Sequence, residues 1–124
     1  MIRGIYQDSK GRLYFTSNNG LSIYDGSRFI NYTSKNGLNF DIVNLIMEMG
    51  EDSIWVVTNS ININCLVKGK MKTLAIKDMN IIINNLCKDE KGDLYATSEE
   101  GLYIFEKDHF TKLPFTDTSG RDIN

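Results

Sequence analysis

One sequence pattern occurs three times along this chain at a spacing of about 40 residues. The segment Ile5–Leu21 returns as Leu86–Leu102, and nine of the seventeen aligned positions are identical. A weaker copy, Ile46–Asn62, keeps the apolar positions but has Ile61-Asn62 where the other two have Gly-Leu. The spacing is 41 residues between the first two copies and 40 between the last two. A period of this length, rich in short apolar segments, is the signature of β-propeller blades, in which each unit needs its neighbours to bury its faces.

Each unit is predicted to contain four short strands. In the first unit they are Ile2–Gln7, Arg12–Ser17, Leu21–Tyr24 and Arg28–Tyr32, and in the third unit they include Leu94–Ser98, Leu102–Phe105 and His109–Leu113. Asp, Asn and Gly separate these segments, as turn formation requires, and they recur too often for helices to form. The expected fold is therefore all-β, with β-propeller-type repeats in which three four-stranded antiparallel blades form part of a propeller. We expect one domain over residues 1–124, with units at 2–41, 42–81 and 82–122.

One pair of residues recurs at the start of every unit and again at the end of the chain. Ile2-Arg3, Val43-Asn44 and Ile83-Asn84 share one position of the repeat, and Ile123-Asn124 occupies it a fourth time. The chain therefore holds three units, whereas closed propellers use about four to eight blades. We expect a piece of a larger protein; a complete three-unit protein is the alternative. Because end units have unpaired faces and edges, the expected partners are further blades of a parent propeller or a second copy of the chain.

Composition excludes several classes of partner. Fourteen Lys and Arg stand against sixteen Asp and Glu, which gives a net charge of −2, and the basic residues form no stripe. Such a chain has no general attraction for a nucleic acid backbone. A membrane-spanning helix needs about 20 mostly apolar residues, and no run of that kind is present. We therefore expect neither nucleic acid binding nor membrane contact by this segment.

The first unit carries short motifs in a fixed order: Asp8-Ser9-Lys10-Gly11, Leu13-Tyr14-Phe15-Thr16-Ser17, Gly20-Leu21, Tyr24-Asp25 and Asn36-Gly37-Leu38. This order resembles the two-component regulator propeller repeat, which typically reads as an Asp and Gly turn, Leu-Trp-Ile-Gly-Thr, Gly-Leu, Tyr-Asp and a closing Asn-Gly-Leu. The resemblance covers nearly the whole chain and is strongest in the first unit and weakest in the second. The departures are that the Trp position holds Tyr14, Trp55 and Tyr95, and the Gly position holds Thr16, Val57 and Thr97.

The resemblance implies a role in signalling. Proteins of this family are hybrid two-component sensors of Bacteroidetes, in which an extracytoplasmic propeller module precedes a membrane span and a histidine kinase and helps to detect glycan breakdown products. It implies that this chain is a non-catalytic, periplasmic part of a membrane-anchored parent, without cofactor, contributing to glycan-related detection or receptor assembly. A generic β-propeller scaffold for protein partners is the alternative. A propeller hydrolase or lyase is disfavoured, because the chain has a single histidine, His109.

The candidate ligand-binding residues lie in the loops between the second and third strands of the units: Asn18, Asn19, Asn59, Glu99 and Glu100. With the inter-unit segments near residues 39–41 and 78–80, these loops are expected to share one rim. Amide and carboxylate groups suit the hydroxyls of an oligosaccharide, since they accept and, for Asn, also donate hydrogen bonds. Turn formation is the alternative role for these asparagines.

Other conspicuous residues have structural interpretations. The recurring aromatic at Trp55 is expected to pack between adjacent blades. Asp8 and Asp89 recur in phase and are expected to cap turns. Cys65 and Cys87 are expected to be reduced core thiols rather than a disulfide. No residue is assigned a catalytic or metal-binding role, and His109 is expected at the surface.

Overall fold

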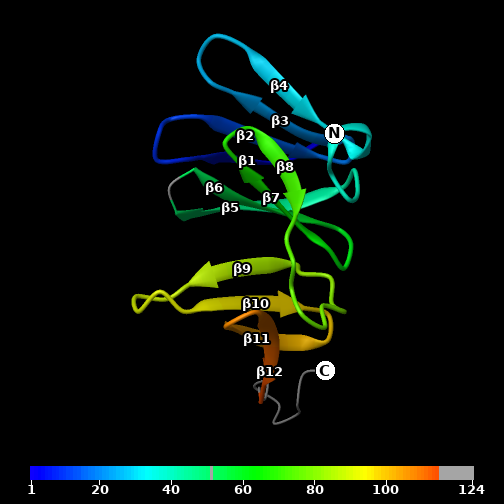
Figure 1. Cartoon of the computed structure of the whole chain (residues 1–124), viewed down its shortest axis with the longest axis vertical. Helices are drawn as coiled ribbons and strands as arrows, with labels where there is room; N and C mark the ends of the chain where they lie inside the picture. The colour runs from blue at the N-terminus through cyan, green and yellow to red at the C-terminus, as the bar shows by residue number, and fades with distance from the viewer. Residues whose placement is uncertain (51, 115–124) are drawn as a thin grey trace.

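The computed structural model describes residues 1–50 and 52–114, and these form three four-stranded antiparallel sheets stacked one above another (Figure 1). The first sheet contains β1 (Ile2–Gln7), β2 (Leu13–Ser17), β3 (Gly20–Tyr24) and β4 (Phe29–Tyr32); the second contains β5 (Val43–Gly50), β6 (Ser53–Thr58), β7 (Ile63–Val67) and β8 (Lys70–Thr73); the third contains β9 (Asn85–Lys88), β10 (Leu94–Ser98), β11 (Gly101–Glu106) and β12 (His109–Leu113). A short 3-10 helix, Ser34–Asn36, follows β4. The predicted all-β repeats of four strands are confirmed, whereas Ile123-Asn124 and the end of the third unit lie outside the described residues.

Each sheet is a meander, in which strands that are neighbours in the sequence are also neighbours in space. The first strands of successive sheets contact one another, β1 with β5 and β5 with β9, so they form the inner side of the stack. In an antiparallel meander, the loop between the second and third strands emerges at the edge where the first strand begins. That edge is where the predicted rim of loops and inter-unit connections is formed.

The turn between the first and second strands is built in the same way in the first and third units. The Oδ1 atom of Asp8 accepts hydrogen bonds from the backbone N–H of Lys10 and Arg12, both at 2.9 Å. Asp89 makes the equivalent pair of bonds in the third unit, so the predicted turn-capping role is confirmed. Gly11, with φ 85°, has the positive φ that this turn requires.

The second unit departs from the predicted alignment by one residue. Val57 pairs with Ile63, just as Thr16 pairs with Leu21 in the first unit, so Ile63 and not Asn62 takes the position of Leu21. The loop between β6 and β7 is therefore one residue longer than its counterparts. An alignment of the units without a gap places Asn62 at the position of Leu21, because the second unit lacks the Gly-Leu pair that marks this position in the other two.

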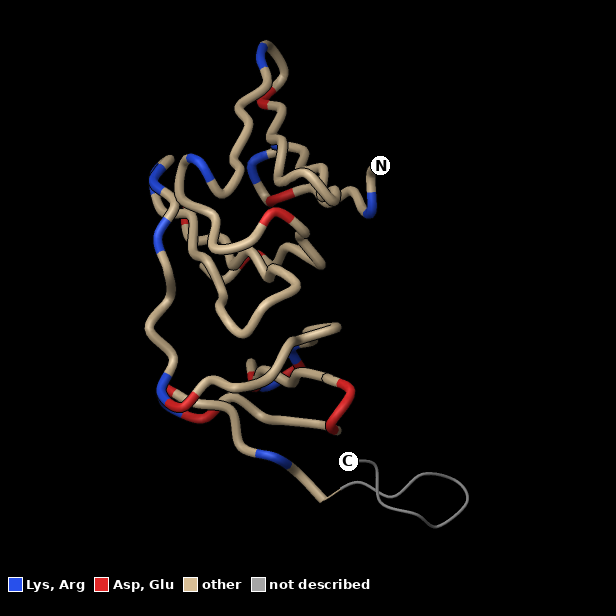
Figure 2. The backbone as a smooth tube through the Cα atoms, turned by 90° about the vertical axis from the view of Figure 1, so that its right-hand side faces the viewer, with Lys and Arg blue, Asp and Glu red and all other residues tan. Residues whose placement is uncertain are grey.

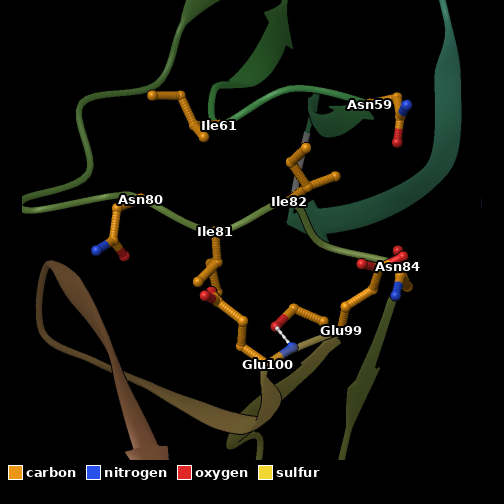
Figure 3. Close-up of a pocket in the computed structure, with 9 residues that line it drawn as sticks. Asn59, Ile61, Asn80, Ile81, Ile82, Asn84, Glu99 and Glu100 are labelled. Atoms are coloured by element: carbon orange, nitrogen blue, oxygen red, sulfur yellow. Dashed lines mark hydrogen bonds between the residues drawn. The ribbon is translucent and has the colours of Figure 1, made fainter. Parts of the chain in front are cut away.

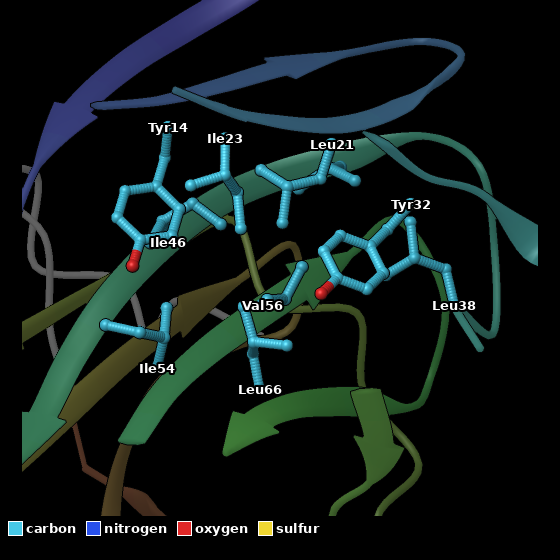
Figure 4. Packing of buried hydrophobic residues seen from close by; sticks show 10 residues of the cluster. Tyr14, Leu21, Ile23, Tyr32, Leu38, Ile46, Ile54, Val56 and Leu66 are labelled. Carbon is cyan, nitrogen blue, oxygen red and sulfur yellow. The ribbon is translucent and has the colours of Figure 1, made fainter. Parts of the chain in front are cut away.

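Two hydrophobic cores hold the three sheets together. The first lies between the first and second sheets, where Tyr14, Leu21 and Ile23 face Ile46 and Val56 (Figure 4). The second lies between the second and third sheets, and its members include, from the second sheet, Leu45, Trp55, Val57, Ile63 and Cys65, and from the third sheet, Leu86, Leu94 and Ala96. Each core is thus an interface between blades rather than the interior of one sheet.

The recurring aromatic occupies the same place in each unit. Tyr14 is 1% exposed in the first core, and Trp55 is 7% exposed in the second. The indole of Trp55 meets Phe105 of the third sheet edge to face, with ring centroids 5.5 Å apart. The predicted packing between blades is therefore confirmed for these two rings. Tyr95, at the same position in the third sheet, is only half-buried, because no described sheet covers that face.

The two cysteines differ in environment. Both are free thiols, and Cys65 is buried in the second core, as expected. Cys87 is exposed, so its expected place in a core was wrong. Cys87 lies opposite Tyr95 on β9 and therefore on the same uncovered face of the third sheet. Tyr6 and Met47, at the same repeat position, are half-buried where the next sheet packs against them.

Candidate functional site

A pocket of about 400 Å³ opens where the loops of the second and third sheets meet. Its lining comes from the β6–β7 loop, the connection that leads to β9, and the β10–β11 loop: Asn59, Ile61, Asn80, Ile81, Ile82, Asn84, Ser98, Glu99 and Glu100. Figure 3 shows Glu99 extending toward Asn84 and Glu100 extending toward Ile81. The pocket therefore combines amide and carboxylate groups with an apolar side formed by isoleucines.

The local sequence explains how this lining is positioned. The Ser98 hydroxyl accepts a hydrogen bond of 3.0 Å from the backbone N–H of Glu100, which fixes the tight β10–β11 turn and turns both glutamates outward (Figure 3). The N–H of Asn84 donates to the carbonyl of Thr97 at 2.7 Å, which ties the incoming connection to the same turn. Ile81 is buried against the second core, whereas Ile82 is 40% exposed beside it.

A chain of hydrogen bonds continues along the rim from this pocket toward the first sheet. The guanidinium of Arg3 donates to Asn18 Oδ1 at 3.2 Å and to Asn44 Oδ1 at 3.4 Å. The amide of Asn44 in turn donates to Asn59 Oδ1 and to the carbonyl of Ile83, both at 3.2 Å. In the first two units, one side chain near the start of the first strand therefore bridges its own loop and the following unit.

The five predicted ligand residues are only partly brought together. Asn59, Glu99 and Glu100 line the pocket, along with Asn80 from the predicted inter-unit segment. Asn18 and Asn19 do not line the pocket: Asn18 is engaged by Arg3, and Asn19 donates its backbone N–H to Ser17. Of the other inter-unit segment, Asn39 accepts from Thr73 and Asp41 accepts from Ser34.

Sequence reasoning missed the apolar part of the pocket and the bridging role of the first-strand residues. The sequence did contain a signal for the bridging role, because the polar residues Arg3, Asn44 and Asn84 occupy one repeat position. Their polarity at the start of an inner strand indicated an exposed rim. The isoleucines gave no comparable signal, since an apolar run in a connection is equally typical of a buried segment.

The opposite edge of the first sheet holds a polar network around the buried carboxylate of Asp8. The Asp8 carboxylate is 1% exposed and accepts hydrogen bonds from Arg12 Nε at 2.6 Å and from the Tyr14 hydroxyl at 2.8 Å. Burial alone would raise the pKa of Asp8, but these two bonds and the backbone N–H groups of Arg12 and Lys10 lower it overall. Burial, together with the bond to Asp8, raises the pKa of Tyr14. The network fixes a turn against the first core, which is a structural role.

The charges of the chain are mixed rather than segregated. Figure 2 shows Lys and Arg interspersed with Asp and Glu along the tube. The pocket lining is different from the rest of the described chain in its charge, because it contains two carboxylates and no Lys or Arg.

Among the residues that the structure describes, the other reactive side chains form no second site. His109 is half-buried, and its Nδ1 lies 3.1 Å from Oδ1 of the adjacent Asp108. In residues 1–50 and 52–114, no three His, Cys, Asp or Glu side chains gather where they could hold a metal ion. The same residues contain no helix that is long and apolar enough to cross a bilayer.

The fold and the rim together define a run of consecutive β-propeller blades. No family model and no curated protein sequence matches the chain. Among solved structures, the chain is similar to the extracellular domain of a hybrid two-component system from B. thetaiotaomicron, with a TM-score of 0.71 and 15% identity over 89% of this chain and 16% of that one. It is similar to the extracellular domain of a one-component system from the same organism, with a TM-score of 0.71 and 21% identity over 100% of this chain and 18% of that one.

An enzyme shares the same fold. Streptogramin B lyase matches with a TM-score of 0.68 and 19% identity over 92% of this chain and 41% of the lyase. The chain therefore spans less than a fifth of the length of the two sensor domains and less than half of the lyase. At such identities the likeness shows the propeller fold, which agrees with the fold that the motif resemblance implied.

Proposed function

We propose that this chain is a non-catalytic part of the ligand-sensing propeller of a two-component sensor, acting in the periplasm as part of a membrane-anchored parent with a histidine kinase. The observation that carries the proposal is the pocket at the rim between the second and third sheets, into which Asn59, Glu99 and Glu100 converge. The similarity in fold to two extracellular domains of B. thetaiotaomicron sensor systems supports the same assignment.

The chemistry of the pocket favours a neutral, hydroxyl-rich ligand such as an oligosaccharide. The amides of Asn59, Asn80 and Asn84 both donate and accept hydrogen bonds, and the two carboxylates accept from hydroxyls. The exposed faces of Ile61 and Ile82 offer an apolar surface for the carbon side of a sugar ring. An anionic ligand is disfavoured, because both charged groups in the lining are negative.

Catalysis is not part of the proposal. The lyase among the similar structures shares the fold, but fold alone does not transfer activity. The one histidine of the chain, His109, is paired with Asp108 at a hairpin and does not line the pocket. No residue is therefore assigned the role of a base or a nucleophile.

The test is a titration of the ¹⁵N-labelled chain with neutral oligosaccharides, monitored by NMR and by calorimetry. We expect weak binding, with shifts confined to the pocket, because the loops of two sheets supply only part of a propeller rim. Asn59→Ala should abolish these shifts, whereas Asn18→Ala, the matched change in the first sheet, should leave them unchanged. Sub-micromolar binding by this chain would contradict the claim that further blades are needed. The absence of any shift at millimolar sugar would contradict the pocket assignment.

A protein-interaction scaffold is the second candidate function, since the same exposed blade faces suit a protein partner. The coding sequence beyond Asn124 separates the two. A membrane span followed by a histidine kinase region is expected for the sensor, and a stop codon at that point would count against it.

A further inference from the structure

A second pocket, of about 140 Å³, lies between the first two sheets at the edge opposite the rim. We call it the interblade pocket. Its walls are apolar side chains from both sheets: Tyr14, Ile23, Ile30 and Tyr32 of the first sheet, and Ile54 and Leu66 of the second. Figure 4 shows all of them except Ile30, with Ile54 and Leu66 on the side opposite the two tyrosines and Ile23. Because both walls belong to this chain, the pocket forms without any further blade.

Both tyrosine hydroxyls beside the interblade pocket are engaged within the chain. Tyr14 donates its hydroxyl to Asp8 Oδ2 at 2.8 Å, and Tyr32 donates its hydroxyl to the carbonyl of Gly69 at 3.0 Å. The second bond also holds the β7–β8 turn against β4, so it helps to fix the width of the pocket. The walls therefore offer a ligand an apolar surface, which is accessible from solvent at Ile30, a residue that is 38% exposed.

The interface between the second and third sheets shows what fills the equivalent space. Leu66 pairs with Met71 across β7 and β8, and Phe105 pairs with Phe110 at the same repeat position across β11 and β12. The ring of Phe105 contacts Trp55 edge to face, and its centroid lies 4.9 Å from that of Phe110. Aromatic rings of the chain itself thus occupy the second interface, where the first interface has two aliphatic side chains and a pocket.

The mouth of the interblade pocket is lined by four charged residues, one of which is a lysine that is free to pair. The other three are bonded within the chain: Arg12 to Asp8, Asp52 to Lys10, and Asp25 to the backbone of its own turn. Within residues 1–50 and 52–114, Lys68 forms no ion pair, and it is exposed at the β7–β8 turn. A carboxylate is the group that complements it.

We propose that the interblade pocket holds a phenylalanine side chain of an extended, acidic peptide segment from a partner protein, with a carboxylate of that segment beside Lys68. An apolar cavity of about 150 Å³ holds a benzene ring, so the volume of about 140 Å³ suits one phenyl group. This ring takes the place that Phe105 and Phe110 fill in the second interface. The interblade pocket and the rim pocket open at opposite edges, so peptide docking is independent of the ligand site proposed above.

The probe is the peptide acetyl-Ser-Asp-Phe-Asp-Ser-amide, titrated into the ¹⁵N-labelled chain. NMR shifts are expected at the backbone amides of Ile23, Ile30 and Gly69. The matched peptide with Ala in place of Phe should bind about tenfold more weakly, because burial of the ring supplies much of the affinity. The peptide with Asn in place of both Asp residues should bind about twofold to fivefold more weakly, as expected for loss of an exposed ion pair. That difference should shrink at high salt.

Substitutions in the chain test the two parts of the site. Leu66→Phe gives the second sheet the residue that the third sheet has at this position, so it should fill the pocket and reduce peptide affinity by about tenfold or more. Lys68→Glu should weaken binding of the Asp peptide and leave binding of the Asn peptide unchanged. Ile30→Ser removes one wall at a partly exposed position and should weaken the Phe peptide but not the Ala peptide, which keeps the test valid if Leu66→Phe does not fold. Circular dichroism checks the fold of each variant.

Two control variants should leave peptide binding unchanged: Lys91→Glu, the matched charge reversal in the β9–β10 turn, and Asn59→Ala in the rim pocket. Equal binding of the Phe and Ala peptides, no shift at millimolar peptide, or undiminished binding to folded Leu66→Phe would each overturn the proposal. Shifts at the interblade pocket that grow with protein concentration alone would also overturn it, since a second copy of the chain would then be the occupant.

Discussion

Replacing Trp55 by alanine tests whether the interfaces between blades hold this fold together. The indole is 7% exposed, lies between the second and third sheets and meets Phe105 edge to face at 5.5 Å. Truncation removes a large buried ring and leaves a cavity, which costs about 3–5 kcal/mol. Of that cost, about 0.5–1.5 kcal/mol belongs to the aromatic pair itself. We expect the urea midpoint of unfolding to fall by roughly 2 M, because the m-value of a small domain is about 1–3 kcal/mol per M.

The matched control is Tyr95→Ala at the same repeat position. Tyr95 is half-buried on a face of the third sheet that no described residue covers, so its truncation is expected to cost about 1 kcal/mol or less. Urea unfolding followed by circular dichroism measures both variants. A loss within about half a kcal/mol for Trp55→Ala would refute the reasoning, since it would place the ring outside any packed interface.

Three further outcomes follow from the described side chains. Because the pKa of Asp8 is lowered in the fold, its ionised form stabilises the protein above its ordinary pKa of 3.8, and this contribution is lost as the pH falls through the lowered value. Asp8→Asn should therefore destabilise the protein by about 1–3 kcal/mol at neutral pH and flatten the acid limb of stability, measured by urea unfolding across the acid range. Within the described residues, the Thr16 hydroxyl is the buried side-chain polar atom that lacks a hydrogen-bond partner. Thr16→Val should stabilise the fold by about 1 kcal/mol in thermal unfolding, whereas Thr97→Val, at the exposed equivalent, should change little in dilute protein. In the folded protein, a thiol reagent should modify Cys87 rapidly and Cys65 only on unfolding, as mass spectrometry of the labelled peptides will show.

The strands and turns followed from the sequence because their signals are local. Asp8 and Asp89 predict the same turn, and the alternation of apolar and polar residues around Tyr14 repeats around Tyr95. Among the strands whose ranges were predicted, the bounds of β1, β10 and β12 match, β2 and β4 begin one residue later, and β3 and β11 begin one residue earlier at a glycine. The β11 strand also ends one residue later than expected. The predicted burial of Cys87 was wrong. A residue on a blade face is buried only when another sheet packs against that face, and the position in the repeat does not say whether one does.

The candidate site was less accessible from sequence for a related reason. Loop position correctly grouped Asn59 with Glu99 and Glu100, since meander topology sends these loops to one edge. It did not reveal that Asn18 is engaged by Arg3, because that contact depends on side-chain reach across a rim. The extra residue in the β6–β7 loop was also hidden, since it shifts the spacing by no more than the variation between units.

The meander order of the strands also determines when each sheet can fold during synthesis of the chain. Every strand pairs with a strand adjacent in the sequence, so a sheet can form its ladder once its own segment of about 40 residues has been made. The apolar face of that sheet then has no partner until the next unit is complete, which takes about 2–8 s at a synthesis rate of roughly 5–20 residues per second. During that interval the ring of Tyr14 or Trp55 is open to solvent and to other nascent chains. We therefore expect that slower translation between units exposes these faces for longer and increases aggregation of the nascent chain.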